Sequence, residues 1–244
     1  MPFTFSHPAI VLPFKYFWIK RFSTTGLVIG SIVPDFEYFV RFRNWTSVSH
    51  KWTGVLWFDL PVAMTLCFVF HEIVKRPLFE NLPDLISSRV MRFSTFNWKR
   101  YFSRRWATVI FSILLGIVSH LLWDRFTHMT YAFIESKPLP PTGHTDFNPS
   151  PSYRIIQIFY SMFGLAVLTY TILRLPPRTV TAGGPKHPFW IMIGFFMASI
   201  MGLAIMFTGL EFMDWITATM SSGMIAVTAT SFLMLRDKAA LLRS

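Results

Sequence analysis

Long uncharged stretches alternate with short charged ones along this chain. Four stretches contain no Asp, Glu, Lys or Arg, and a fifth contains only Asp59. A helix of about 20 apolar residues can cross the hydrocarbon core of a bilayer. The pattern therefore predicts an all-α, polytopic membrane helix bundle with about five transmembrane helices, in which residues 1–244 form a single integral membrane domain. The expected spans are 52–70, 106–123, 155–173, 188–210 and 215–235.

The N-terminal part of the chain follows a different pattern. Its two apolar stretches, 8–19 and 22–34, are separated by Lys20-Arg21, and each is too short to span a bilayer alone. We expect an interfacial or re-entrant helical pair here. The single domain should then have three parts: 1–53 with candidate site residues, 54–130 with the core site helices, and 154–236 with three further spans.

Two loops between the expected spans have a distinct composition. Residues 74–105 are basic and rich in aromatic side chains, so we expect one amphipathic helix lying on anionic lipid. Residues 136–153 are rich in proline and should form an irregular loop on the opposite side of the membrane.

Composition and charge support the membrane interpretation. The chain is 52% hydrophobic and 14% charged, whereas a soluble domain has about 25% charged residues. A net charge of +11 could indicate nucleic-acid binding, but the basic residues gather in alternate loops, as the positive-inside rule expects. We therefore expect a multi-pass protein of the inner (plasma) membrane, with membrane lipids as partners and no nucleic acid. Cys67 is the only cysteine, which excludes an intramolecular disulfide and a thiolate metal site.

Three ionisable residues recur at the end of the second expected span. His120, Asp124 and His128 are four residues apart, so a continuous helix would carry them along one face. Imidazole and carboxylate groups ligate zinc and manganese, and ionisable groups on an apolar span indicate function by default. His120 and His128 would lie about 12 Å apart along the helix, too far to share one ion. Either Asp124 bridges two ions, or the helix ends near Asp124 and the chain folds back.

The expected topology brings other ionisable residues to the same face of the membrane. His50 precedes the first strong span, and Asp35 and Glu37 follow the N-terminal hairpin that also returns His7. Each residue also has an ordinary structural interpretation. His120 could be a packing residue, Asp124 could pair with Arg125 at a helix end, and Asp35 could cap a helix or begin a turn.

Several motifs resemble a known family. The opening Met1-Pro2-Phe3-Thr4-Phe5-Ser6-His7-Pro8-Ala9, the stretch 26–38 with its Pro34-Asp35-Phe36-Glu37 turn, Phe58-Asp59-Leu60-Pro61 and 116–128 are similar to domain-of-unknown-function family 4184. That bacterial membrane family is similar to predicted membrane-bound metal-dependent hydrolases. The resemblance is clearest over residues 1–130. It implies metal ligands at His7, Asp35, His50, His120 and Asp124.

Two functional interpretations follow from these residues. The first is a metal-dependent hydrolase of a phosphoester or lipid headgroup at the outer membrane face. It would bind zinc or manganese through His7, Asp35, His50, His120, Asp124 and His128, with Glu37 or Asp35 as general base. The second is an ion- or proton-binding transport protein. A non-catalytic protein with a structural metal site is a further alternative.

Overall fold

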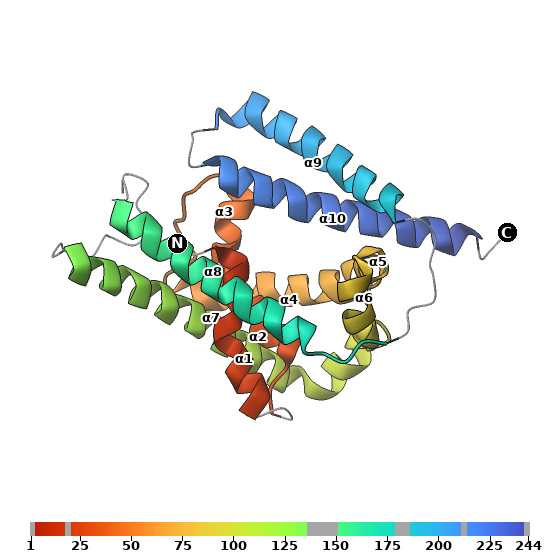
Figure 1. The fold of residues 1–244 in the computed structure, drawn as a ribbon, viewed down its shortest axis with the longest axis horizontal. Helices are drawn as coiled ribbons and strands as arrows, with labels where there is room; N and C mark the ends of the chain where they lie inside the picture. The colour runs from red at the N-terminus through yellow and green to blue at the C-terminus, as the bar shows by residue number, and fades with distance from the viewer. Residues whose placement is uncertain (1–2, 18–20, 136–150, 179–185, 211–213, 242–244) are drawn as a thin grey trace. The chain divides into compact units, whose positions relative to one another are not determined.

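The computed structural model describes residues 3–17, 21–135, 151–178, 186–210 and 214–241 (Figure 1). These residues form helices and loops, with no strand among them. Five of the described helices are long and apolar enough to cross a membrane, which confirms the predicted all-α, multi-pass class. Their bounds are Val55–Asn81, Trp98–Thr130, Arg154–Leu173, His187–Phe207 and Asp214–Asp237. The expected proline-rich loop lies for the most part outside the described residues.

The chain divides into two compact units. Unit 1 comprises Met1–Glu37, Trp45–Cys67 and Arg100–Thr171, and unit 2 comprises Tyr38–Asn44, Phe68–Lys99 and Ile172–Ser244. All of the residues that the sequence predicted as site residues belong to unit 1. The assignment of the whole chain to one membrane domain stays a prediction.

Unit 1 begins with short helical elements where a helical pair was predicted. A 3₁₀ turn, η1 (Thr4–Ser6), leads into α1 (Pro8–Phe17), and α2 (Thr24–Gly30) follows. The side chain of Ser23 caps α2 by accepting a hydrogen bond from the Gly26 amide. The turn η2 (Val33–Asp35) and α3 (Phe36–Arg41) complete this part of the chain.

The long helices of unit 1 follow. A π-helical turn, η3 (Val55–Asp59), continues into α4 (Leu60–Val69). Helices α7 (Trp98–Glu135) and α8 (Pro151–Leu173) run side by side, and Tyr160 packs edge-on against Trp123 at 5.2 Å (Figure 1).

Two glycines allow α2 and α7 to cross at backbone contact. A β-carbon at Gly30 would lie 2.2 Å from the Ile113 carbonyl oxygen, and one at Gly116 would lie 2.5 Å from the Leu27 carbonyl oxygen. No larger residue fits at either position without moving the backbone. This crossing fixes the end of α2 against α7, one turn before His120.

Unit 2 corrects the prediction for residues 74–105, which do not form one helix. The described chain there forms η4 (Phe70–Val74), α5 (Lys75–Asn81), α6 (Asp84–Val90) and η5 (Met91–Phe93), before α7 begins. The break after α5 has a simple cause. Proline cannot continue the hydrogen-bond ladder and forces the preceding residue into an extended conformation, and Leu82 before Pro83 has ψ 155°.

The remaining helices of unit 2, α9 (His187–Thr208) and α10 (Asp214–Leu241), pack against each other (Figure 1). Their contact buries Phe189, Ile193 and Ala226.

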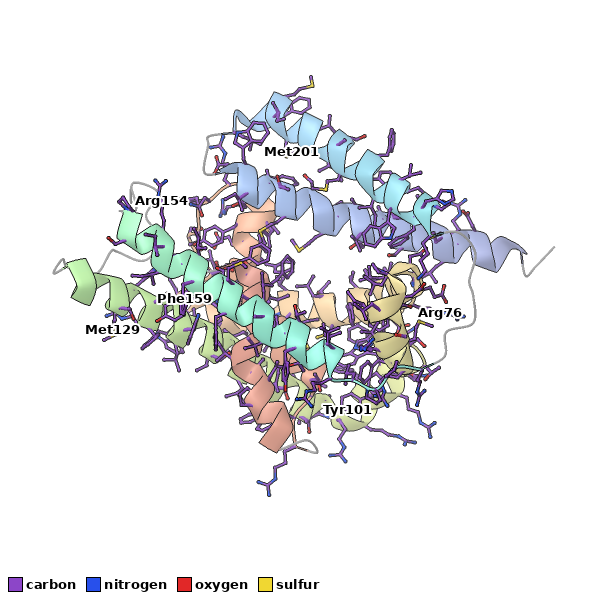
Figure 2. The ribbon with its side chains drawn as sticks, in the orientation of Figure 1. Arg76, Tyr101, Met129, Arg154, Phe159 and Met201 are labelled. Atoms are coloured by element: carbon purple, nitrogen blue, oxygen red, sulfur yellow. The ribbon has the colours of Figure 1, made fainter. Side chains whose placement is uncertain are left out.

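Apolar side chains on the long helices of unit 1 point outward. Phe159 on α8 is 64% exposed and Met129 on α7 is 54% exposed (Figure 2). Exposed side chains of this kind suit a lipid environment, because they would be costly in water.

Candidate metal centre

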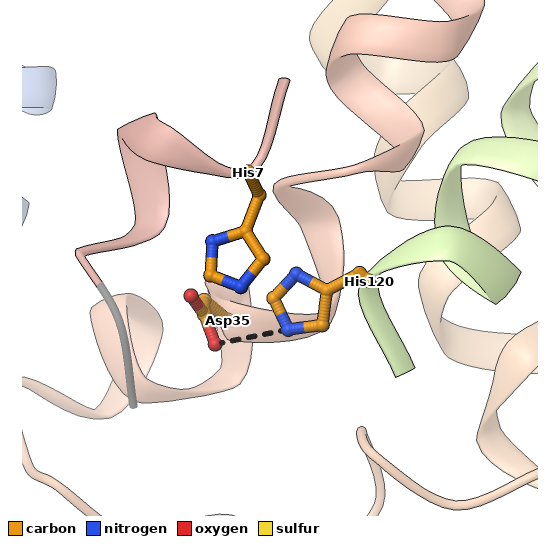
Figure 3. A group of neighbouring side chains, drawn as sticks. All are labelled: His7, Asp35 and His120. Atoms are coloured by element: carbon orange, nitrogen blue, oxygen red, sulfur yellow. Dashed lines mark ion pairs between the residues drawn. The ribbon is translucent and has the colours of Figure 1, made fainter. Parts of the chain in front are cut away.

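Five ionisable side chains from four separate segments of unit 1 converge on one place. His7 follows η1, Asp35 ends η2, His50 lies in the loop before η3, and His120 and Asp124 lie one turn apart on α7. Figure 3 shows three of them, with His7 and His120 facing Asp35. The side chains of His7 and His120 are fully buried, and that of Asp35 is 2% exposed. Those of His50 and Asp124 are 10% and 9% exposed, so these two form the accessible edge of the cluster.

Four donor atoms have the spacing of a metal-ligand set. The His50 Nε2 atom lies 3.3 Å from His120 Nε2 and 3.3 Å from Asp35 Oδ1. His120 Nε2 lies 3.5 Å from Asp35 Oδ1, and Asp124 Oδ2 lies 3.6 Å from His50 Nε2 and 3.7 Å from His120 Nε2. Ligands about 2.0–2.1 Å from a tetrahedral zinc ion are about 3.3–3.4 Å from one another. The four donors therefore fit a single ion.

His7 adds a fifth group beside these four. Its Nε2 atom lies 3.4 Å from Asp124 Oδ1, the carboxylate oxygen that faces away from the other histidines. Its ring stacks on that of His120 with the centroids 4.1 Å apart. His7, Asp35 and His120 also form a second ligand group, in which one donor atom of each lies within 4.8 Å of the others (Figure 3). The Asp124 carboxylate thus connects the four-donor group to His7.

The second nitrogen of each imidazole is held by a neighbouring group. His7 Nδ1 donates to the Thr4 carbonyl oxygen at 3.2 Å, and His120 Nδ1 donates to the Ser31 carbonyl oxygen at 2.8 Å. A carbonyl oxygen can only accept, so both rings carry their proton on Nδ1 and direct an Nε2 lone pair into the cluster. His50 Nδ1 lies 3.2 Å from the Ser49 hydroxyl. Fixing the outer nitrogen in this way is typical of metal-ligating histidines.

Asp35 supplies the observation that tests whether a cation fits. The Thr4 hydroxyl donates to its Oδ2 atom, while its buried Oδ1 atom has no hydrogen-bond partner in the described chain. Burial would raise the pKa of Asp35, but His120 and His50 outweigh burial and hold it well below its usual range. An ionised, buried oxygen without a donor needs a cation, and a metal at this position would satisfy it.

The chain belongs to a family that the sequence motifs suggested. The sequence matches the family described as domain of unknown function (DUF4184) over residues 1–241. The chain is a member of DUF4184. The match extends well beyond residues 1–130, where the resemblance was clearest. No curated protein and no solved structure matches the chain.

Glu37 lies outside the donor group and holds the loop that carries His50. Its Oε2 atom accepts hydrogen bonds from the Thr46 hydroxyl at 2.6 Å and from the amides of Val48 and Ser49 at 2.9 and 2.8 Å. Its Oε1 atom accepts from the amide and hydroxyl of Ser47 at 2.9 and 2.8 Å. Burial would raise the pKa of Glu37, but these hydrogen bonds hold it well below its usual range. The contacts support a positioning role, and a general-base role stays a prediction.

His50 itself has a strained backbone. Its φ of 62° lies in the left-handed region, which is uncommon for a residue with a side chain. The grip of Glu37 on the preceding residues maintains this conformation, as does the packing of Gly54, where a β-carbon would lie 2.2 Å from the Val48 carbonyl oxygen. Burial would lower the pKa of His50, but its hydrogen bonds to Asp124 and Asp35 raise it to about 9.

His128 is not brought together with the other predicted ligands. Helix α7 runs without interruption from Asp124 to Glu135, so the alternative in which the chain folds back at Asp124 is wrong. In the described chain neither ligand group includes His128, as the helical spacing requires for a single ion. A role for His128 as ligand of a second ion stays a prediction.

Asp59 is a residue that the sequence singled out only weakly. It lies in η3 with 0% of its surface exposed, and neither carboxylate oxygen has a hydrogen-bond partner in the described chain. The signal in the sequence was its position as the only charged residue of an expected span. By contrast, nothing in the sequence pointed to Thr4 or Ser31, because backbone carbonyl groups occur at every residue.

Proposed function

We propose that this protein is a membrane-embedded, metal-dependent hydrolase of a phosphoester. It binds a divalent ion, zinc or manganese, through His50, His120, Asp35 and Asp124, with His7 in contact with Asp124. The observation that carries this proposal is the convergence of two imidazole nitrogens and two carboxylate oxygens at separations of 3.3–3.7 Å. Two ionised carboxylates would balance the charge of a divalent cation.

The chemistry of the donors supports hydrolysis. A divalent ion with mixed histidine and aspartate ligands, when bound, polarises a phosphoryl oxygen and lowers the pKa of water. The protein residues hold that ion, fix the imidazole rings and exclude bulk water from all but one edge. A substrate would approach along the edge formed by His50 and Asp124, whose side chains are the most exposed of the five.

The position of the ligands along the chain supports a substrate at the membrane. His120 and Asp124 lie on the candidate span Trp98–Thr130, within its last three turns. Polar groups near the end of a span lie close to the headgroup region. We therefore propose a lipid headgroup phosphoester as substrate. The outer face and the inner membrane rest on the distribution of basic loops and remain part of the proposal.

Metal analysis of detergent-purified protein tests this function. The wild type, purified without chelator and offered zinc or manganese, should hold about one ion per chain, or about two if His7 ligates a second. Asp124→Asn keeps the shape of the side chain but removes its charge, so bound metal should fall sharply while the fold survives. Arg125→Gln is the matched control. A guanidinium cannot be a ligand, so this variant should retain the metal.

The outcomes separate the alternatives. A wild type that binds no metal, together with equal stability losses in the two variants, would end the metallohydrolase proposal and favour a proton-binding or ion-pair role for the cluster. A wild type that binds metal tightly but hydrolyses no phosphoester would indicate a structural metal site.

A further inference from the structure

Asp59 is the most unusual carboxylate in unit 1. It is completely buried, and neither of its oxygens has a hydrogen-bond partner in the described chain. Buried carboxylates in folded proteins are normally paired with a cation or hydrogen-bonded, because removing an unpaired charge from water is costly. A residue that keeps this cost without a visible structural partner is a candidate for function.

The other described carboxylates of unit 1 are already engaged. Asp35 and Asp124 face the histidines, and Glu37 accepts hydrogen bonds from the loop before His50. Asp59 is therefore the carboxylate in the described part of this unit whose two oxygens are both available to accept a hydrogen bond.

The elements around Asp59 place it beside the metal centre. The turn η3 packs against η2, which ends at Asp35. Gly54, at the start of η3, is in close contact with the backbone of Val48, in the loop that carries His50. The charged groups that act most strongly on the Asp59 carboxylate are those of His50 and His120. Asp59 nevertheless belongs to neither group of ligand atoms within 4.8 Å of one another. It thus lies near the donors but outside their set.

We propose that Asp59 binds the water molecule that attacks the phosphoester, and that it accepts the proton of this water. This inference rests on the proposed function. As the water oxygen forms its bond to phosphorus, the O–H bond breaks and the proton passes to the Asp59 carboxylate. The bond from phosphorus to the alcohol oxygen breaks, and that oxygen keeps the electron pair and takes a proton from solvent. Asp59 then returns its proton to solvent.

This assignment divides the work among the carboxylates. Asp35 and Asp124 hold the ion, Glu37 positions His50, and Asp59 acts on water. A ligand and a water-binding residue respond differently to loss of charge, which makes the assignment testable even before the natural substrate is known.

The test compares Asp59→Asn with Asp124→Asn and the wild type in detergent. Metal content, thermal unfolding and the visible spectrum of the cobalt(II)-substituted protein are measured for each. Asp59→Asn should keep the metal content of the wild type, and its Tm should equal or exceed that of the wild type, because an unpaired buried charge has been removed. Its cobalt spectrum should change, since the water near the ion loses its acceptor. Hydrolysis of an aryl phosphodiester should fall by about 10²–10⁴-fold. Asp84→Asn, an exposed aspartate in unit 2, is the control and should leave all four readouts unchanged.

Two results would overturn the inference while leaving the proposed function intact. If Asp59→Asn loses its metal as Asp124→Asn does, then Asp59 is a ligand. If Asp59→Asn keeps its metal and an unchanged cobalt spectrum but unfolds at a lower temperature, its role is structural. A wild type that binds no metal is a different result, because the proposed function and this inference then fail together.

Discussion

Replacing Glu37 with Gln should release the loop that carries His50. The carboxylate accepts five hydrogen bonds from three consecutive residues and Thr46. Gln has nearly the same shape but offers only one oxygen. If that oxygen takes the place of Oε2, the amide NH₂ faces the Ser47 N–H, and two donors oppose each other. The opposite orientation is worse, because the NH₂ group would then face the amides of both Val48 and Ser49.

The magnitude of this effect follows from the contacts. A buried N–H left without an acceptor costs about 1–3 kcal/mol. The three hydrogen bonds to the remaining oxygen lose their charge, and each weakens by about 1 kcal/mol. Together these changes should lower the free energy of unfolding by about 4 kcal/mol. The left-handed backbone of His50 then loses its restraint, so metal affinity should fall about 10–100-fold, as it does when groups that orient metal ligands are removed.

Thermal unfolding and metal titration of the detergent-purified protein measure the two effects. The matched control is Glu80→Gln. Glu80 forms an exposed ion pair with Arg76 on one helix at 2.9 Å, and losing such a pair should change stability by less than about 0.5 kcal/mol. Metal binding by the control should equal that of the wild type.

The result that refutes the reasoning is a Glu37→Gln variant that unfolds and binds metal like the wild type. If such a variant also lost hydrolysis completely, Glu37 would be the general base that the sequence suggested rather than the anchor of a loop.

Two further predictions concern the helix crossing and pH. Gly116→Ala should destabilise the protein by about 1–3 kcal/mol and weaken metal binding, because its β-carbon would meet the Leu27 backbone. Gly194→Ala meets nothing within 4 Å and should stabilise α9 by up to about 1 kcal/mol, as seen by thermal unfolding. Because the pKa of His50 is raised to about 9, metal-free protein at pH 7 holds a proton there that an ion must displace, so apparent affinity should rise about tenfold per pH unit up to pH 9. The metal-free protein should instead lose stability as the pH rises from about 6.5 to 9, and calorimetric titration in two buffers that detects no proton release on metal binding at pH 7 would contradict this reasoning.

The sequence predicted the parts of the site that depend on local periodicity and topology. His120 and Asp124 share a helix face because they are four residues apart, and this spacing needs no tertiary information. Asp35, His50 and His7 were placed with them because the spans alternate in direction across the membrane. The distances between their donor atoms bear out this grouping.

Other features depend on contacts that leave no local pattern. Glu37 was predicted as a base because it follows Pro34-Asp35, but its partners lie in a loop whose path is set by tertiary packing. The single helix expected over 74–105 ignored Pro83, which ends α5 and allows α6 to begin in a new direction. Amphipathic composition alone does not show where such a helix is interrupted.

The contact between His7 and Asp124 has a consequence for how the protein is made. These residues are 117 positions apart, and His7 lies almost at the start of the chain. During synthesis the N-terminal elements leave the ribosome long before α7 exists, so their polar side chains must wait without partners. The nascent chain can therefore complete this centre only after the second long helix has entered the membrane, and the ion is acquired as a late event of biogenesis.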